Sequence, residues 1–255
     1  MSFSPDKIQT APTPRAPLII LYAPNGHGKT TFLASIGKPF IIDTEDKCNT
    51  LETPRYVPST LRDIEDCLKY LLECDKFPAP ALAIDTLDWL EKKIHEEMCN
   101  VYAVKGIKVS NINEATHEQL NFGKGSKIAA NEFNARILTL LEAIRAKYNI
   151  PIILCAQHAK VPVNLPDKDK HDIIDLRLDK TLAGYISDKV DAKLFIQLRY
   201  FKDFKNSMHP TEERYLITRP QRGVSAKNNL HLPAEVSIGE KTGWIDFISA
   251  IGTGV

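Results

Sequence analysis

A glycine-containing segment near the N-terminus constrains this chain more than any other feature. Residues 23–30 read Ala-Pro-Asn-Gly-His-Gly-Lys-Thr, directly after an apolar run at residues 17–22. The segment fits the phosphate-binding pattern G-x-x-x-x-G-K-[ST], with Ala23 in place of the first glycine. The apolar run predicts a buried strand and residues 30–36 predict a helix, which is the context that the pattern requires.

Such a loop binds phosphate because its backbone N–H groups form a concave anion site at the start of a helix. We expect a bound nucleotide, ATP with Mg²⁺, in which Lys29 reaches the β- and γ-phosphates and the Thr30 hydroxyl ligates the metal. The alternative is a chance Gly-Lys-Thr in a loop, and the flanking strand and helix weigh against it. The residues predicted to contact the nucleotide are Ala23, Pro24, Asn25, Gly26, His27, Gly28, Lys29, Thr30 and Thr31.

Strand and helix patterns alternate after this loop. Connections of this length between strands imply parallel pairing, so we expect an α/β fold with a mostly parallel central sheet flanked by helices. Two later strands around a polar turn predict a C-terminal β-hairpin extension, before a last strand, turn and helix at residues 224–251. The predicted strands are residues 39–43, 79–85, 150–156, 191–200 and 214–219, the predicted helices are residues 60–72, 86–94 and 131–148, and residues 160–177 are predicted to form an exposed loop.

Acidic residues lie at the ends of two predicted strands. Asp85 ends one strand, and we expect its carboxylate to hold the Mg²⁺ shell, with capping of the following helix as the alternative. Glu45 follows Asp43 and Thr44 at the end of another strand, where a carboxylate can polarise the water that attacks the γ-phosphate. From spacing alone, a solvated turn acid is nearly as good an interpretation of Glu45, and Asp43 is expected to be structural.

A polar pair, Gln157 and His158, follows the strand at residues 150–156. A side chain there could sense the γ-phosphate. A polar strand end explains Gln157 as well from chain order alone, and a satisfied core histidine explains His158.

These motifs, in this order, resemble the RecA-like P-loop NTPase core, and in particular the phage-encoded Sak-type ATPases of single-strand annealing and recombination. Further segments carry the resemblance: Phe122-Gly123-Lys124-Gly125, the acidic stretch at residues 188–191, and residues 226–233 with Lys227 and Asn228. The resemblance implies a flexible N-terminal arm at residues 1–16, an ATPase core at 17–235, and a C-terminal strand and helix extension at 236–255 packed on the core.

The resemblance also implies roles for single residues. Glu45 takes the catalytic position, Asp85 is the second acidic motif, and Gln157 couples the γ-phosphate to a DNA-binding loop after it. Lys227 is the expected trans-acting cation that reaches a neighbouring subunit's nucleotide. Arg219 and Arg222 are alternatives for that cation, and a solvated surface cation is the competing interpretation of all three.

Single-stranded DNA is the partner that this resemblance implies, with a homo-oligomer, ring or filament, as the binding form and a single-stranded-DNA-binding protein as a further partner. Single-strand binding combines basic contacts to the backbone with aromatic stacking. Net charge is only +1, so affinity is expected to depend on ATP-dependent assembly. The residues predicted to contact DNA are Phe122, Lys124, Lys127, Lys160, Lys168 and Lys170.

Composition narrows the class of protein. With 33 Lys and Arg against 32 Asp and Glu, a generally polycationic binder is excluded. Five cysteines without a C-x-x-C pair favour a reducing compartment and argue against a zinc site. Apolar runs are too short to span a bilayer, so we expect no membrane contact and a cytoplasmic location, the host bacterial cytoplasm if the chain is phage-encoded.

Two other functions share the same loop. A replication accessory protein resembling a helicase loader would use ATP to bind a partner protein, with residues 241–251 as a docking helix. A small-molecule kinase comes last, because its lid would need several arginines and residues 160–177 hold one.

Overall fold

The computed structural model describes residues 15–113, 117–163, 171–202, 207–221 and 223–254. Its centre is a twisted sheet with the strand order β10-β8-β7-β1-β5-β4-β2-β3. The strands of this path are β1 (Leu18–Ala23), β2 (Phe40–Asp43), β3 (Arg55–Tyr56), β4 (Leu82–Asp85), β5 (Ile152–Val163), β7 (Ala192–Lys202), β8 (Met208–Ile217) and β10 (Glu235–Ile238).

Pairing is parallel from β7 through β1, β5, β4 and β2 to β3, and antiparallel where β8 and β10 extend the sheet. The predicted α/β class is thereby confirmed, with its mostly parallel sheet and its C-terminal antiparallel extension. The strand β1 lies in the middle, and β5 separates it from β4. The carboxyl ends of β1 and β4 therefore lie at one edge of the sheet, on either side of β5, which continues beyond that edge to Val163.

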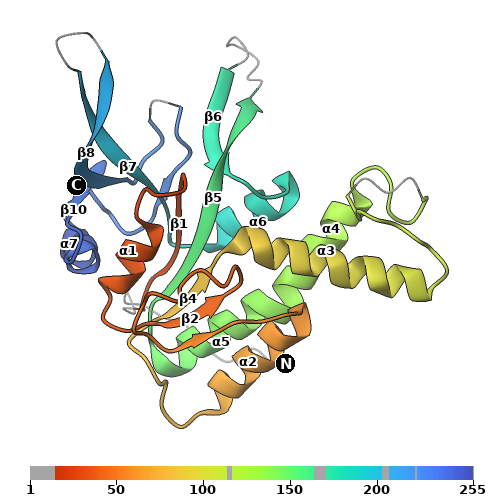
Figure 1. The fold of residues 1–255 in the computed structure, drawn as a ribbon. Coiled ribbons are helices and arrows are strands. Elements are labelled where there is room, and N and C mark those ends of the chain that lie inside the picture. The colour runs from red at the N-terminus through yellow and green to blue at the C-terminus, as the bar shows by residue number, and fades with distance from the viewer. Residues whose placement is uncertain (1–14, 114–116, 164–170, 203–206, 222, 255) are drawn as a thin grey trace, which may run out of the picture.

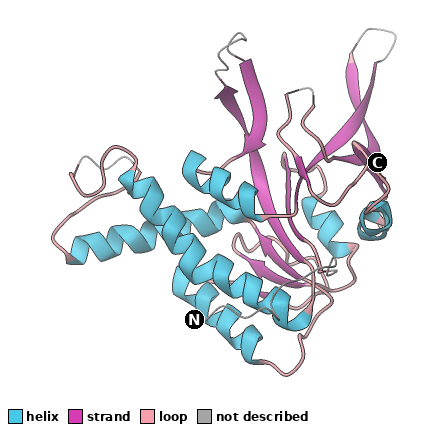
Figure 2. Ribbon diagram, turned by 180° about the vertical axis from the view of Figure 1, so that it is seen from behind, coloured by secondary structure: helices cyan, strands magenta, loops and turns pink. Residues whose placement is uncertain are grey.

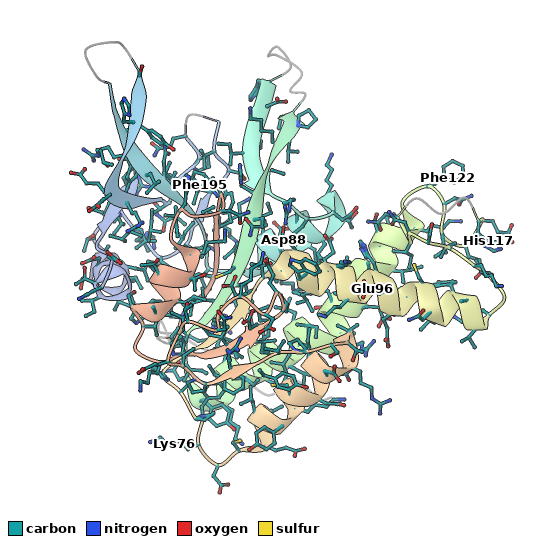
Figure 3. The ribbon with its side chains drawn as sticks, viewed as in Figure 1. Lys76, Asp88, Glu96, His117, Phe122 and Phe195 are labelled. Carbon is teal, nitrogen blue, oxygen red and sulfur yellow. The ribbon has the colours of Figure 1, made fainter. Side chains whose placement is uncertain are left out.

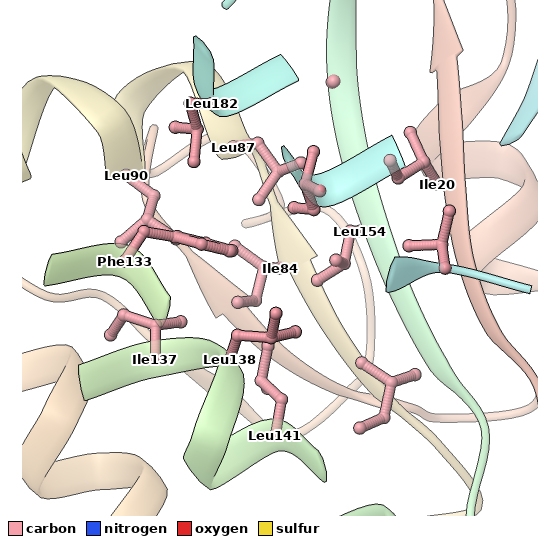
Figure 4. Close-up of a cluster of buried hydrophobic side chains, with 14 of the residues drawn as sticks. Ile20, Ile84, Leu87, Leu90, Phe133, Ile137, Leu138, Leu141, Leu154 and Leu182 are labelled. Carbon is pink, nitrogen blue, oxygen red and sulfur yellow. The ribbon is translucent and has the colours of Figure 1, made fainter. Parts of the chain in front are cut away.

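The central strands are apolar on both faces because helices cover both sides. Alternate residues of β1 point to opposite faces, so Ile20 and Tyr22 join one core cluster while Ile19 and Leu21 join the other. The first cluster packs under α2 (Leu61–Glu73), α3 (Leu87–Val104) and α5 (Thr139–Tyr148), as Figures 2 and 4 show. The second packs under α1 (Lys29–Ala34) and α7 (Gly243–Ala250).

Local sequence accounts for where α2 begins. Thr60 accepts a hydrogen bond from the Asp63 backbone N–H, and the Asp63 carboxylate accepts one from the Thr60 N–H. This capping box satisfies donors that a helix N-terminus leaves without partners. From there Leu61, Ile64 and Leu68 recur on the buried face.

The segment predicted as one helix at residues 131–148 is longer and less regular. It begins with α4 (Lys124–Glu132), continues through a π-helical stretch η2 (Phe133–Leu138) and ends with α5. Figure 1 shows α4 beside α3 at one end of the molecule.

The prediction of an exposed loop at residues 160–177 was wrong for the residues of that range that the structure describes. The strand β5 continues to Val163 and pairs in antiparallel register with β6 (His171–Leu176). The β5–β6 ribbon and the β7–β8 ribbon both extend beyond the sheet at the edge where the β1–α1 loop lies (Figure 1). Two further elements complete the described chain, α6 (Lys180–Lys189) and the short β9 (Lys227–Asn228), which pairs with β7.

Candidate nucleotide site

Two glycines of the loop between β1 and α1 adopt the left-handed backbone conformation. Gly26 and Gly28 have φ of 79° and 101°, values that residues with a side chain rarely adopt. An open cleft with a volume of about 210 Å³ begins at this loop. The residues that line the cleft are Asn25, Gly26, Gly28, Lys29, Thr30, Thr31, Asp43, Glu45, Lys47, Asp85, Thr86 and Gln157.

Lys29 is buried at the base of this cleft. Its Nζ donates to the Ala23 carbonyl at 2.9 Å and to Gln157 Oε1 at 3.2 Å. Burial lowers the pKa of the ammonium, and the nearby Asp85 carboxylate opposes that effect. Within the part of the chain that the structure describes, neutral oxygens alone accept hydrogen bonds from this buried cation, so it is well placed to bind phosphate charge.

The predicted metal ligands lie together. Thr30 Oγ1 donates to Asp85 Oδ2 at 3.4 Å, and the buried thiol of Cys48 donates to the same oxygen at 3.4 Å. Burial raises the pKa of both Asp85 and Cys48, and the adjacent carboxylates raise that of Cys48 further. Hydroxyl and carboxylate oxygens are the ligands that Mg²⁺ prefers, so Thr30 and Asp85 fit the ion, whose chemistry would be to neutralise phosphate charge.

Glu45 also lines the cleft. Its Oε1 accepts from Thr86 Oγ1 at 2.9 Å, and its Oε2 accepts from Lys47 Nζ at 2.6 Å. Burial acts to raise its pKa, but the hydrogen bonds from Lys47 and Thr86 outweigh burial and hold the pKa below its ordinary value. The Glu45 carboxylate is therefore ionised at neutral pH, the form that a general base needs.

Asp43 has a different role from its neighbour Glu45. Its carboxylate is fully buried and accepts from the backbone N–H groups of Lys47 and Cys48 at 3.1 and 2.8 Å. Arg55 binds it at 3.0 Å. These contacts fix the turn after β2, as expected for a structural residue.

Gln157 joins the nucleotide cleft to the β5–β6 ribbon. Its side chain accepts from Lys29, while its backbone N–H donates to Asp88 Oδ2 at 2.7 Å. Asp88 Oδ1 in turn accepts from Arg177 Nε at 2.9 Å, and the Arg177 backbone N–H donates to the Gln157 carbonyl at 2.9 Å. The start of α3, the middle of β5 and the chain after β6 thus meet at one hydrogen-bonded point.

The two histidines near the loop are neutral at pH 7. Burial lowers the pKa of His27, and its neighbours His158, Lys29 and Arg214 lower it further. Burial and the charge of Lys29 also lower the pKa of His158. His158 is half-buried on the ribbon, opposite Leu176.

The residues predicted to contact DNA lie in two separate places. Phe122 is 95% exposed at the outer end of the α3–α4 pair, away from Asp88 (Figure 3), and Lys124 and Lys127 are exposed near it. Lys160 is exposed on β5, in the other place. Lys168 and Lys170 lie outside the described residues.

Two of the three predicted trans-acting cations, Lys227 and Arg219, form hydrogen bonds within their own chain. Lys227 Nζ donates to the carbonyls of Ser187 and Asp188 at the end of α6, at 3.0 and 2.8 Å. Arg219 binds the carbonyls of Leu232 and Gly254. Arg222 lies outside the described residues, and the trans role stays a prediction for all three.

Sequence reasoning did not predict roles at the site for Asp88, Cys48 and Arg214, nor for Lys47 and Thr86, which line the cleft and bind Glu45. Asp88 is three residues beyond Asp85, so its place at the start of α3 was a usable signal. Cys48 and Arg214 reach the site from elements whose packing no local pattern predicts.

One comparison decides the family. Residues 15–230 match the family described as AAA domain, a span that includes every nucleotide-cleft residue named above. The chain belongs to the AAA domain family. It is therefore a P-loop ATPase of the AAA type, and residues 23–30 carry its phosphate-binding sequence pattern.

Other comparisons add less. A crystal structure of the RadB recombinase is among the similar solved structures, with 15% identity, 89% of this chain and 90% of that chain covered, and a TM-score of 0.45. No curated protein matches the sequence. Among the described residues, no helix has both the length and the apolar character that a membrane span requires.

Proposed function

We propose that this AAA-type ATPase uses Mg²⁺-ATP to bind single-stranded DNA and to promote annealing or recombination of the phage type. The observation that carries the proposal is the position of Gln157. Its side chain contacts the nucleotide-binding Lys29, and its backbone belongs to the ribbon β5–β6. A change in phosphate occupancy at Lys29 can therefore move a projecting surface element.

The chemistry follows from the side chains in the cleft. Lys29 binds phosphate charge, and the ionised Glu45 accepts the proton of the attacking water. Lys47, whose side chain is 74% exposed, can leave Glu45 at little cost when nucleotide binds. Bound Mg²⁺ would neutralise charge on the phosphates, with Thr30 and Asp85 as the protein groups that hold its shell.

DNA contact is assigned to two surfaces. Phe122 offers an exposed ring for base stacking, and Lys124 and Lys127 offer positive charge for the backbone. Lys160 adds a charge on the β5–β6 ribbon. Because the two surfaces lie apart on one subunit, a strand that contacts both would cross from one subunit to the next in a ring or filament.

Binding of a fluorescent oligothymidine tests this proposal. Its fluorescence anisotropy is measured with no nucleotide, with ADP and with a non-hydrolysable ATP analogue, in wild type and in Glu45→Gln. We expect tight binding only with the analogue, and with ATP itself in the variant, because that variant holds ATP without cleaving it. Affinity that is equal in all nucleotide states contradicts the proposal.

A partner-binding role resembling that of a helicase loader is the second candidate. On α7, Ile245 is 62% exposed and Ile248 is 39% exposed, while Phe247 is buried. Two exposed isoleucines one helical turn apart favour a protein contact there. This function predicts nucleotide binding with no response to DNA.

A further inference from the structure

The nucleotide-binding loop rests on the β7–β8 ribbon at two consecutive residues. The imidazole of His27 lies near the backbone of Ile196 on β7, which acts to raise its pKa against the effect of burial. The next residue, Gly28, lies against Arg214 of β8. A Cβ added at Gly28 would be 3.0 Å from the Nε and 3.1 Å from the Cδ of Arg214.

The Arg214 guanidinium has a buried donor, Nε, that has no hydrogen-bond acceptor among the described residues. The neighbouring Glu213 does not supply one, because its carboxylate pairs with Arg199 of β7 at 3.1 Å. His27 Nδ1, on the adjacent loop residue, is likewise buried without a partner.

The unpartnered Nε donor of Arg214, beside an anion-binding loop, indicates where additional negative charge would be stabilised. Buried polar groups are nearly always hydrogen-bonded, so exceptions of this kind mark strain or an absent partner. Arginine is suited to a phosphate because its donors form a planar fork and its charge is permanent. The backbone of Arg214 belongs to β8, so a shift of its guanidinium can be transmitted to the β7–β8 ribbon.

We propose that Arg214 is a phosphate-responsive residue acting within its own subunit, and that it couples nucleotide occupancy to the β7–β8 ribbon. This inference rests on the proposed use of ATP, and it adds a second connection to the surface besides the one through Gln157. The ligand is the polyphosphate of a nucleoside triphosphate. The base and sugar make no contribution to this contact.

Binding measurements with three ligands test the proposal. Calorimetry on wild type, Arg214→Gln, Arg214→Lys and the control Arg199→Gln would use ATP, ADP and adenosine. We expect Arg214→Gln to lower the affinity for ATP about tenfold, because one charge-assisted hydrogen bond is lost. Its affinity for adenosine should equal that of wild type. Arg214→Lys should recover most of the affinity, and Arg199→Gln should behave as wild type.

Hydrogen exchange supplies the second readout. With the non-hydrolysable analogue at saturation, amides of β7 and β8 should exchange more slowly in wild type, and this protection should be lost in Arg214→Gln. Unchanged ATP affinity in that variant overturns the proposal. An equal loss of affinity for ATP and for adenosine, together with a lower melting temperature, also overturns it. That result would mean that the substitution damages the fold and not a phosphate contact. If wild type itself binds no ATP, the proposed function fails first.

Discussion

The buried carboxyl of Glu91 predicts a measurable pH dependence of stability. Glu91 lies on α3, is 9% exposed, and accepts a hydrogen bond from the Asp179 backbone N–H at 2.9 Å. Burial raises its pKa to about 7 from an ordinary value of 4.5, and the charges of Asp179 and Asp88 add to the increase. The folded protein therefore favours the protonated carboxyl.

The sign follows from the raised pKa. The stability that the neutral carboxyl contributes is present below pH 4.5 and is lost as pH rises through 7. The difference between the two pKa values corresponds to about 3 kcal/mol in total, of which about 2 to 3 kcal/mol is lost between pH 5 and pH 8. Glu91→Gln retains an acceptor for the Asp179 N–H and cannot ionise, so it should not show this loss.

Urea unfolding of wild type and Glu91→Gln at several pH values between 5 and 8 measures the effect. The free energy of unfolding of the variant should gain about 2 to 3 kcal/mol on wild type across that range. A matched control is Glu96→Gln on the same helix, where the side chain is 59% exposed and 4.0 Å from Lys92. Its difference from wild type should stay within about 0.5 kcal/mol at every pH. Parallel curves for wild type and Glu91→Gln would refute the reasoning.

Three further substitutions have defined outcomes. Glu45→Gln should reduce the rate of ATP hydrolysis about 100-fold or more in a phosphate-release assay while ATP binding persists, because the general base is lost; unchanged turnover would assign Glu45 to the turn alone. Phe122→Ala should weaken oligothymidine binding at least about fivefold, since one stacking contact is lost, and should leave the melting temperature unchanged because the ring is 95% exposed. Asp88→Asn should lower kcat about tenfold with little change in KM, because the ion pair with Arg177 that fixes the Gln157 backbone is lost; a rise in KM alone would argue against that positioning role.

Local sequence patterns predicted much of the fold, because in the central elements the local residue preferences agree with the structure that forms. Apolar runs marked β1, β2 and β4, and turn glycines with Lys29 and Thr30 marked the loop between strand and helix. The side chains of Thr30, Asp85 and Gln157, which the sequence singled out, also line the same cleft. They do so because neighbouring parallel strands run to the same edge of the sheet.

The ribbons were harder to predict. Charged residues and Pro162 interrupt the alternation in residues 160–176, so the pattern favoured a loop. Cross-strand pairing of β5 with β6 overrode that local preference. The π-helical stretch at Phe133–Leu138 was missed for a related reason, because it keeps nearly the spacing of an α-helix.

Long-range contacts were beyond any local pattern. Gly28 and Arg214 meet only because β7 lies beside β1 and β8 lies beside β7. Likewise, the thiol of Cys48 reaches Asp85 only because the turn after β2 folds over the end of β4. Contacts of this kind follow from sheet order, which the sequence does not display.

ATP turnover with and without single-stranded DNA tests the central claim most directly. Phosphate release would be measured for wild type and for Lys29→Ala, in the presence of Mg²⁺. We predict turnover in wild type that DNA stimulates, and neither basal nor stimulated turnover in the variant, because the buried cation of the nucleotide-binding loop is lost. Wild type that hydrolyses no ATP, or a Lys29→Ala variant as active as wild type, would contradict the account.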